Sequence, residues 1–414
     1  MKEHILAACK LLSEIYTDRT YADRVFDGEN ASALSVRLVF GVLERDTEIS
    51  FILAQLAEKQ PQKPVRILLK VGAYALLYLD NVPDYAIVSE CVEVVRSMGK
   101  GGASGFVNAV LKRIAARRFS LPEPGAPDYL SVHYSKPEWF VDRLIAEFGE
   151  ARAKAVLEDK GGDDVHLRVN SRVSSAEAVI KLLRAHAQEY TPSAVGGILT
   201  RVTPLVKSLF AEGVVTYQSP SSVLAVQALS PGGKTEILDL CSAPGGKAVY
   251  ASELAPGDRV TACDVHPHRL ELVRKYCSRM RADNVTPVLS DATVFEPRFE
   301  GRFDFVMADV PCSCFGTFRK HPDVFLQRGE DAIKQLSAVQ KKILQNAVRY
   351  LKDGGVLVYS TCTLFREENS DNAEFARKLG LVPEKMPIPF ENDGTLQILP
   401  RGEWDGFFIA RFRK

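Results

Sequence analysis

The chain has 414 residues, which is long enough for two or three ordinary domains. With 46% hydrophobic and 25% charged residues, its composition is typical of a water-soluble globular protein. The formal net charge of +1 neither supports nor excludes a nucleic-acid partner, because binding needs a local basic face rather than a basic total.

Signals for export or membrane insertion are not expected in this chain. Its first residues lack the charged-then-apolar pattern of a signal peptide. The most apolar stretch, residues 67–79, is interrupted by Lys70 and is too short to span a bilayer. Eight cysteines in such a chain favour free thiols over a disulfide framework. We therefore expect a cytoplasmic protein with no membrane partner.

The first predicted domain, residues 1–119, has a helical pattern throughout. Apolar residues recur at helical spacing in 34–42 and in 67–78, and residues 88–95 continue as another helix. A glycine-rich break at 99–102 precedes a mixed apolar and basic helix over 106–114. Periodicity alone indicates no more than a helical bundle.

A linker and a small module come next. Residues 120–127 hold three prolines and a glycine, which suit neither a helix nor a central strand. Within residues 128–220, a helix opens near Pro137, residues 164–170 form a strand, and Ser174-Ser175 can cap a helix that runs to about residue 185. This pattern predicts a small α+β module, and no catalytic constellation is visible in it.

The third predicted domain, residues 221–414, alternates strands with helices, which predicts a doubly wound, mostly parallel sheet. The strands that matter here span 236–240, 258–263, 286–290, 303–308 and 355–359. The first runs into a glycine-containing loop, and the last two each precede a cysteine peptide. Ligands of open α/β sheets lie at the carboxyl ends of the strands, so all three peptides should converge on one crevice.

The loop and the strand ends indicate a cofactor. The pair Gly245-Gly246 alone is a weak signal, because it can simply form a turn. Asp264, however, ends the next strand roughly 20 residues later, where such folds bind ribose hydroxyls. Asp291 follows the third strand, placed to accept from an adenine amino group. Because no phosphate-cradling loop is present, S-adenosylmethionine fits better than a dinucleotide, whose Gly-x-Gly-x-x-Gly loop is also missing.

The cysteines fall into two groups. Buried free cysteines usually behave as small hydrophobic residues, and this is the expectation for Cys9, Cys91, Cys263 and Cys277. Cys312-x-Cys314 with His321 hints at a metal, but zinc sites need wider spacing and a fourth ligand, so no metal is expected. Cys312 and Cys362 each follow a buried strand, which predicts cysteine-based chemistry on a bound cofactor.

Both ends of the chain resemble known families. Residues 71–74, 82–83, 88–93 and above all 105–111, with Phe106-Val107-Asn108, resemble the NusB-type RNA-binding fold. Residues 241–247, residues 309–316 with 319–323, and residues 360–363 with 367–369 resemble the cofactor, Pro-Cys and nucleophile motifs of RsmB/Sun-type RNA cytosine-5 methyltransferases. Three sites depart from the family pattern: Ser242, Cys314-Phe315 and residues 218–222.

The resemblance implies a fold and an activity. It implies a Rossmann-like class I methyltransferase domain behind a NusB-like RNA-binding domain, with S-adenosylmethionine as cofactor and a cytosine of small-subunit (16S) ribosomal RNA as substrate. A monomer is expected. Two alternatives remain open: the same chemistry on transfer RNA or large-subunit ribosomal RNA, or a non-catalytic RNA-binding assembly or antitermination factor.

The resemblance also assigns roles to residues. It implies that Cys362 attacks C6 of the base, that Asp309 contacts N3, and that Cys312 assists product release. Lys247 is expected to lower a thiol pKa. The expected cofactor-binding residues are Cys241, Ser242, Ala243, Pro244, Gly245, Gly246, Lys247, Asp264, Asp291 and Asp309.

Overall fold

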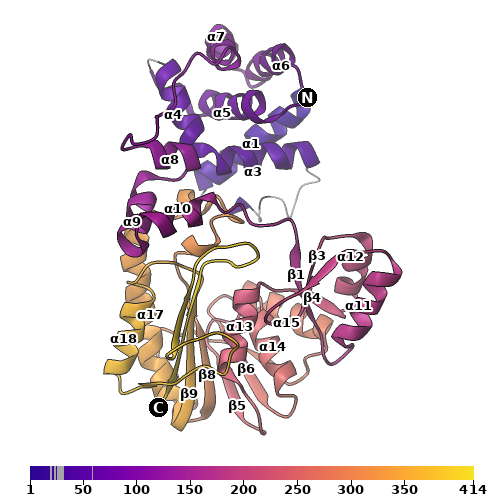
Figure 1. Cartoon of the computed structure of the whole chain (residues 1–414), viewed down its shortest axis with the longest axis vertical. Coiled ribbons are helices and arrows are strands. Elements are labelled where there is room, and N and C mark those ends of the chain that lie inside the picture. The colour runs from indigo at the N-terminus through magenta and orange to yellow at the C-terminus, as the bar shows by residue number, and fades with distance from the viewer. Residues whose placement is uncertain (19–20, 23–24, 26–31, 58) are drawn as a thin grey trace. The chain divides into compact units, whose positions relative to one another are not determined.

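The computed structural model describes residues 1–18, 21–22, 25, 32–57 and 59–414 (Figure 1). The contacts between residues divide the described chain into two compact units. Unit 1 comprises Met1–Glu158 and Phe318–Glu330, and unit 2 comprises Asp159–Thr317 and Asp331–Lys414. Within the described ranges, no helix has the length and apolarity that crossing a membrane requires. The three-domain division at residues 119, 128 and 221 stays a prediction.

Unit 1 opens with a helical bundle, as the apolar periodicity predicted. Its elements are α1 (Lys2–Asp18), α3 (Ala33–Glu44), α4 (Asp46–Leu56), α5 (Lys63–Tyr78), α6 (Asp84–Ser97), the 3-10 turn η1 (Gly101–Ala103) and α7 (Ser104–Ala115). Helix α5 is buried along most of its length. At Gly72 a Cβ atom would lie 2.9 Å from Leu111 Cδ2 and 3.1 Å from Cys91 Sγ. Glycine at this position therefore lets α6 and α7 pack closely on α5.

A distant segment of the chain completes unit 1. Three further helices, α8 (Tyr129–Tyr134), α9 (Glu138–Phe148) and α10 (Glu150–Glu158), are joined by α16 (Val324–Gln327). The ring of the buried Phe140 lies 5.5 Å from that of Phe318 and 4.8 Å from that of Phe325, centroid to centroid. The backbone N–H of Ala22 also donates to Asp323 Oδ2 at 3.0 Å.

Unit 2 begins with a small antiparallel sheet in the order β2-β3-β1-β4. The strands are β1 (Val165–Val169), β2 (Tyr190–Pro192), β3 (Ile198–Thr200) and β4 (Val215–Tyr217), accompanied by α11 (Ala176–Ala185) and α12 (Pro204–Ala211). Ser175 caps α11 by accepting from the Ala178 N–H, as the sequence predicted. The buried Asn170 side chain donates to Gly213 O and Met280 O, which joins the end of β1 to the C-terminus of the helix that ends at Met280.

The large sheet of unit 2 confirms the Rossmann-like prediction. Its strands are β5 (Glu236–Asp239), β6 (Arg259–Asp264), β7 (Val285–Leu289), β8 (Phe303–Asp309), β9 (Leu351–Thr361), β10 (Val382–Pro383), β11 (Thr395–Ile398) and β12 (Phe407–Arg413). The order is β10-β12-β9-β8-β5-β6-β7, with β11 also paired to β12. Strands β5 to β9 are parallel, and β12 runs antiparallel to β9.

Alternating side chains give this sheet two buried faces. Ile237 and Val358 pack on one face, against α13 (Pro220–Leu229), α14 (Gly246–Leu254) and α15 (Pro267–Met280). Leu238 and Leu357 pack on the other, against α17 (Asp331–Tyr350) and α18 (Ser370–Lys378). Figure 1 shows the two groups of helices on opposite sides of the strands. After β7 the chain returns to the other side of β5, so the strand order switches between β5 and β8, where such sheets bind ligands.

Candidate active site

Polar and thiol residues gather at the carboxyl ends of the parallel strands. Asp239 ends β5, Asp264 ends β6, Asp309 ends β8, and Cys362 directly follows β9. The register pairs Asp309 with Ser360 on the neighbouring strand. Parallel strands bring their carboxyl ends to one edge, so residues far apart in the sequence meet at the switch point.

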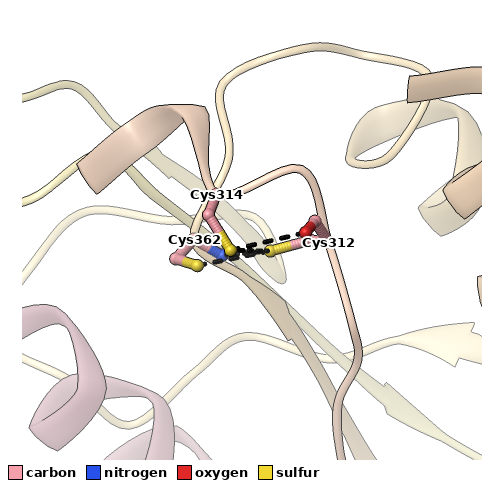
Figure 2. A group of neighbouring side chains, drawn as sticks. All are labelled: Cys312, Cys314 and Cys362. Atoms are coloured by element: carbon pink, nitrogen blue, oxygen red, sulfur yellow. Dashed lines mark hydrogen bonds between the residues drawn. The ribbon is translucent and has the colours of Figure 1, made fainter. Parts of the chain in front are cut away.

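The two predicted cysteines lie in contact. Cys312 Sγ is 3.3 Å from Cys362 Sγ, and the Cys362 N–H points to Cys312 Sγ at 3.3 Å. Cys312 is buried and Cys362 is partly buried. A third thiol joins them, because Cys314 Sγ lies 4.0 Å from Cys312 Sγ. Figure 2 shows all three side chains pointing toward one another, two from the loop after β8 and one from the end of β9.

Close backbone contacts hold the two cysteine loops together. The Gly316 N–H donates to Cys362 O at 3.0 Å, and the Gly406 N–H donates to Gly316 O at 2.9 Å. A Cβ atom on Gly316 would lie 2.6 Å from the Gly406 carbonyl carbon and 2.9 Å from Cys362 O. Glycine at 316 is therefore required for the approach that fixes the position of Cys362.

Beneath the loops, Glu368 forms the centre of a buried polar cluster. Its carboxylate accepts from the Ser313 N–H at 2.9 Å, from Ser313 Oγ at 2.5 Å and from Gln340 Nε2 at 2.9 Å. Burial raises the pKa of Glu368, although these hydrogen bonds oppose the shift. The residue after Cys312 is thus tied to the loop that follows Cys362.

Asp309 contacts Lys247 and Ser360. Lys247 Nζ lies 2.8 Å from Asp309 Oδ2, and Ser360 Oγ donates to Asp309 Oδ1 at 2.7 Å. Burial disfavours the charge on Lys247, but the ion pair and hydrogen bond with Asp309 outweigh it and raise the Lys247 pKa. Both carboxylate oxygens of Asp309 act as acceptors in this arrangement.

The charge of a Cys362 thiolate contributes to the raised Lys247 pKa, and the expected effect of Lys247 on a thiol stays a prediction. Contact with Cys312 favours the Cys362 thiolate, but the Cys314 thiol, burial and the Asp309 charge together raise the Cys362 pKa well above its usual range. Contacts with Cys314 and Cys362, and then burial, raise the pKa of Cys312 as well. The sequence could not reveal that the Lys247 ammonium also pairs with Asp309.

The glycine loop lies at the ends of β5 and β6. Ser242 N–H donates to Cys263 O at 2.7 Å, which fixes the loop to β6. Gly245 has φ +108° and precedes α14, and a Cβ there would lie 3.3 Å from Val273 Cγ1. The predicted run Cys241, Ser242, Ala243, Pro244, Gly245 and Gly246 therefore forms one turn between β5 and α14, with Lys247 in the first turn of the helix.

The two predicted ribose and adenine carboxylates differ in their surroundings. Asp264 is buried, accepts from the His266 N–H at 3.0 Å and pairs with Arg269 at 3.3 Å. Asp291 is exposed and accepts from the N–H and Oγ1 of Thr293 at 2.8 and 2.7 Å. Both lie beyond strand ends on the predicted edge of the sheet, and their roles stay predictions.

Asp239 is a site residue that the sequence reasoning missed. Its carboxylate is buried at the end of β5, and neither oxygen makes a hydrogen bond of good geometry with a described residue. The Ser242 hydroxyl and the Cys241 N–H lie close enough only to oppose the rise in its pKa. Burial, and then the nearby Asp309 charge, raise the pKa of Asp239 to about 7. A buried carboxyl without a partner suits a cationic ligand group. The available signal was its position, last in the strand that enters the glycine loop.

Three family models match the chain. Residues 226–413 match the 16S rRNA methyltransferase RsmB/F family, residues 5–116 match the NusB family, and residues 136–199 match a ferredoxin-like domain of RsmF/B-like methyltransferases. Together these matches account for the helical bundle, the small module and the large sheet.

Curated relatives and solved structures agree with these matches. The probable ribosomal RNA small subunit methyltransferase B of Bacillus subtilis (strain 168) is 32% identical over 92% of this chain and 90% of its own length. Ribosomal RNA small subunit methyltransferase B of Xylella fastidiosa (strain 9a5c) is 34% identical over 92% and 91%. The crystal structure of PH0851 has a TM-score of 0.83 and 25% identity, covering 100% of this chain and 99% of that one. A methyltransferase homologue from Pyrococcus horikoshii has a TM-score of 0.60 and 28% identity, covering 71% and 100%.

Proposed function

The chain belongs to the RsmB/F family of 16S rRNA methyltransferases, and on that basis we propose that it methylates C5 of a cytosine in small-subunit ribosomal RNA. Its cofactor is S-adenosylmethionine, which supplies the methyl group when bound. The observation that carries the proposal is the 3.3 Å contact between Cys312 Sγ and Cys362 Sγ beside the glycine loop. A protein that only binds RNA gains nothing from two such thiols.

Cys362 is proposed as the nucleophile. C5 of cytosine is too weak a nucleophile to take a methyl group unaided. When the Cys362 thiolate adds to C6, a sulfur–carbon bond forms, the C5–C6 double-bond electrons move into the ring, and C5 becomes enamine-like. The Gly316 N–H on the Cys362 carbonyl holds this residue in place for the attack. The target base must leave its stack to reach the thiol.

Asp309 and Lys247 are proposed to stabilise the ring. Negative charge builds on N3 and O2 of the base as the sulfur adds to C6. Asp309 is proposed to donate a proton to N3, for which its carboxyl must be protonated once the base is bound. The Lys247 ammonium, 2.8 Å from Asp309 Oδ2, supplies positive charge beside it. Base binding must then rearrange the Asp309 contacts, since both oxygens accept hydrogen bonds from the protein here.

Cys312 is proposed to act in release. After methylation, the C5 proton passes to solvent water and its electron pair re-forms the C5–C6 double bond. The bond between sulfur and C6 breaks, and Cys362 leaves as a thiolate. Cys312 Sγ lies 3.3 Å from the departing sulfur, close enough to return a proton to it. Its raised pKa keeps the Cys312 thiol protonated, as a proton donor at this step must be.

The cofactor is proposed to bind along the edge formed by β5, β6 and β7. The unpaired Asp239 carboxyl fits a cofactor that carries an ammonium and a sulfonium group. Residues proposed to contact it are Cys241, Ser242, Ala243, Pro244, Gly245, Gly246, Lys247, Asp264, Asp291 and Asp309. We further propose a cytoplasmic site of action, where ribosomal RNA is available; the monomeric state stays a prediction.

Methyl transfer from labelled S-adenosylmethionine to deproteinised small-subunit RNA tests the proposal. We expect label in one cytosine, and bisulfite mapping of total RNA from a deletion strain should lose that single site. Label in transfer RNA or large-subunit RNA instead would support cytosine-5 methylation but show that the proposed substrate is wrong. If the protein bound RNA but transferred no methyl group to any of the three RNAs, the alternative function as a non-catalytic assembly factor would be favoured.

A further inference from the structure

We propose that Cys312, Cys314 and Cys362 together form a binding site for a thiophilic metal ion such as Zn²⁺ or Cd²⁺, and that the bound ion blocks the nucleophile. The binding stands on geometry alone; the block rests on the proposed function of Cys362. The spacing Cys312-x-Cys314 disfavours zinc when these two residues are considered alone. The fold adds the third ligand, Cys362, from the end of β9.

The sulfur positions already match a thiolate site. All three Sγ atoms lie within 4.8 Å of one another, at 3.3 Å for Cys312 to Cys362 and 4.0 Å for Cys312 to Cys314. With metal–sulfur bonds of about 2.3 Å, the sulfurs of a tetrahedral zinc site lie about 3.8 Å apart. Small side-chain adjustments therefore suffice to place the three sulfurs, which Figure 2 shows directed at one point, around a metal ion.

The third thiol has no part in the proposed methylation. Two cysteines are enough for attack and release, yet Cys314 turns its sulfur to the same point, where it also approaches Cys312 O at 3.4 Å. Cys314 adopts φ +63°, a left-handed conformation that L residues other than asparagine, aspartate and histidine rarely take. The loop thus keeps a non-glycine residue in an uncommon conformation and directs a sulfur inward.

Charge at the cluster favours a cation. Thiolates this close cannot all carry charge without positive charge between them, and the three Sγ atoms lie within 4.8 Å of one another. The neighbouring Lys247 ammonium is paired with Asp309 and leaves that need unmet. A divalent metal would displace the thiol protons and neutralise the thiolates. Once bound to metal, the Cys362 sulfur shares electron density with the ion, which lowers its nucleophilicity and holds it away from a base.

Cadmium titration of the reduced full-length protein tests the site. Thiolate coordination gives a sulfur-to-cadmium charge-transfer band in the ultraviolet, a readout that needs no methylation. We expect saturation at a single ion, and Cys314→Ala to weaken binding by about tenfold or more. Cys314→Ser is the second variant, and Cys277→Ala, on α15, is the matched control that should bind as the original protein does.

Zinc inhibition supplies the second measurement. Cys314→Ala should keep its methylation activity while needing about tenfold more Zn²⁺ for half inhibition. The proposed site would be overturned if no charge-transfer band appeared. It would also be overturned if both Cys314 variants bound cadmium as tightly as the original protein. Cadmium binding that depends on Cys314 in a protein inactive on every RNA would instead overturn the proposed function and keep the site.

Discussion

The carboxylate of Glu368 accepts hydrogen bonds from both the backbone N–H and the hydroxyl of Ser313, at 2.9 and 2.5 Å. Ser313 follows Cys312, and Glu368 lies six residues beyond Cys362 in the chain. This side chain therefore fixes one cysteine loop relative to the other from below, without touching the reacting atoms. Its importance should appear in the rate of methylation and not in cofactor affinity.

Glu368→Ala tests this positioning role. It removes the acceptor of the buried Ser313 N–H, at a cost of about 1–3 kcal/mol in the free energy of unfolding. The Ser313 hydroxyl and Gln340 Nε2 each lose one acceptor but keep Thr363 Oγ1 and Pro311 O as partners. We expect a large fall in the methylation rate at saturating substrates, partial rescue by Glu368→Gln and unchanged S-adenosylmethionine affinity by calorimetry. Glu374→Ala, on the exposed side of α18, is the control. A fall in stability with no change in rate would reduce Glu368 to a purely structural residue.

Cys362→Ala and Cys312→Ala should fail at different steps. Cys362→Ala cannot form the bond to C6, so it should make no methylated RNA in a single turnover while still binding cofactor. Cys312→Ala should attack and methylate, then retain the RNA in an adduct that survives denaturing electrophoresis. An adduct from Cys362→Ala would reverse the two assignments, and no adduct from either variant would leave Cys312 as a space-filling residue.

The raised pKa of Asp239 predicts a pH dependence of cofactor binding. Because this pKa is about 7, the free site is mostly protonated at lower pH, whereas a cationic ligand group needs the carboxylate. Affinity should therefore rise with pH up to pH 7 and then level off, with a loss of about fivefold from pH 7 to 6. Asp239→Asn should remove the dependence in calorimetry. If the affinity of that variant for the cofactor depended on pH as before, a group other than Asp239 would be responsible for the titration.

The same shift affects stability with a definite sign. A carboxyl whose pKa is raised on folding favours the folded state below its unfolded pKa, and that contribution is lost as pH rises toward 7. Asp239→Asn should thus raise the melting temperature at neutral pH, in the absence of cofactor.

Asp264→Ala should weaken S-adenosylmethionine binding by about 1–3 kcal/mol, the usual cost of leaving a buried polar partner unsatisfied. Arg269 pairs with Asp264 and also donates to Ala243 O at 3.0 Å, so the substitution should loosen the glycine loop too. Asp353→Ala, at an exposed position of β9, is the control for calorimetry. Equal affinity in the two variants would remove Asp264 from the cofactor site.

The basic end of α7 should supply RNA affinity. Lys112, Arg113, Arg117 and Arg118 are exposed there or just beyond it. Replacing all four with alanine should weaken RNA binding and lower the salt slope by about 0.7 for each lost phosphate contact on single-stranded RNA. Cofactor affinity should not change. An unaltered salt slope would place the RNA contacts on another surface.

The sequence predicted the parts of the site that lie at strand ends. Alternating apolar runs located β5, β8 and β9, and position alone then brought Asp309, Cys312 and Cys362 to one edge. The sequence does not predict which side chains from distant parts of the chain contact one another. The sequence marked Glu368 only as part of residues 367–369, and nothing in that motif shows that its carboxylate binds Ser313. Cys314 reaches the cysteine pair from a left-handed backbone conformation, which the sequence does not show either. The pairing of Lys247 with Asp309 is likewise a contact that charge alone did not predict.

The assignment of Phe318–Glu330 to unit 1 has a consequence for synthesis on the ribosome. The chain emerges from its N-terminus, so Phe140 is exposed to the cell long before its partners Phe318 and Phe325 have been translated. During that interval an apolar surface on the nascent chain lacks its cover, which is the condition that recruits chaperones. The N-terminal unit can therefore reach its final packing only after β5 to β8, half of the strands of the large sheet, have left the exit tunnel.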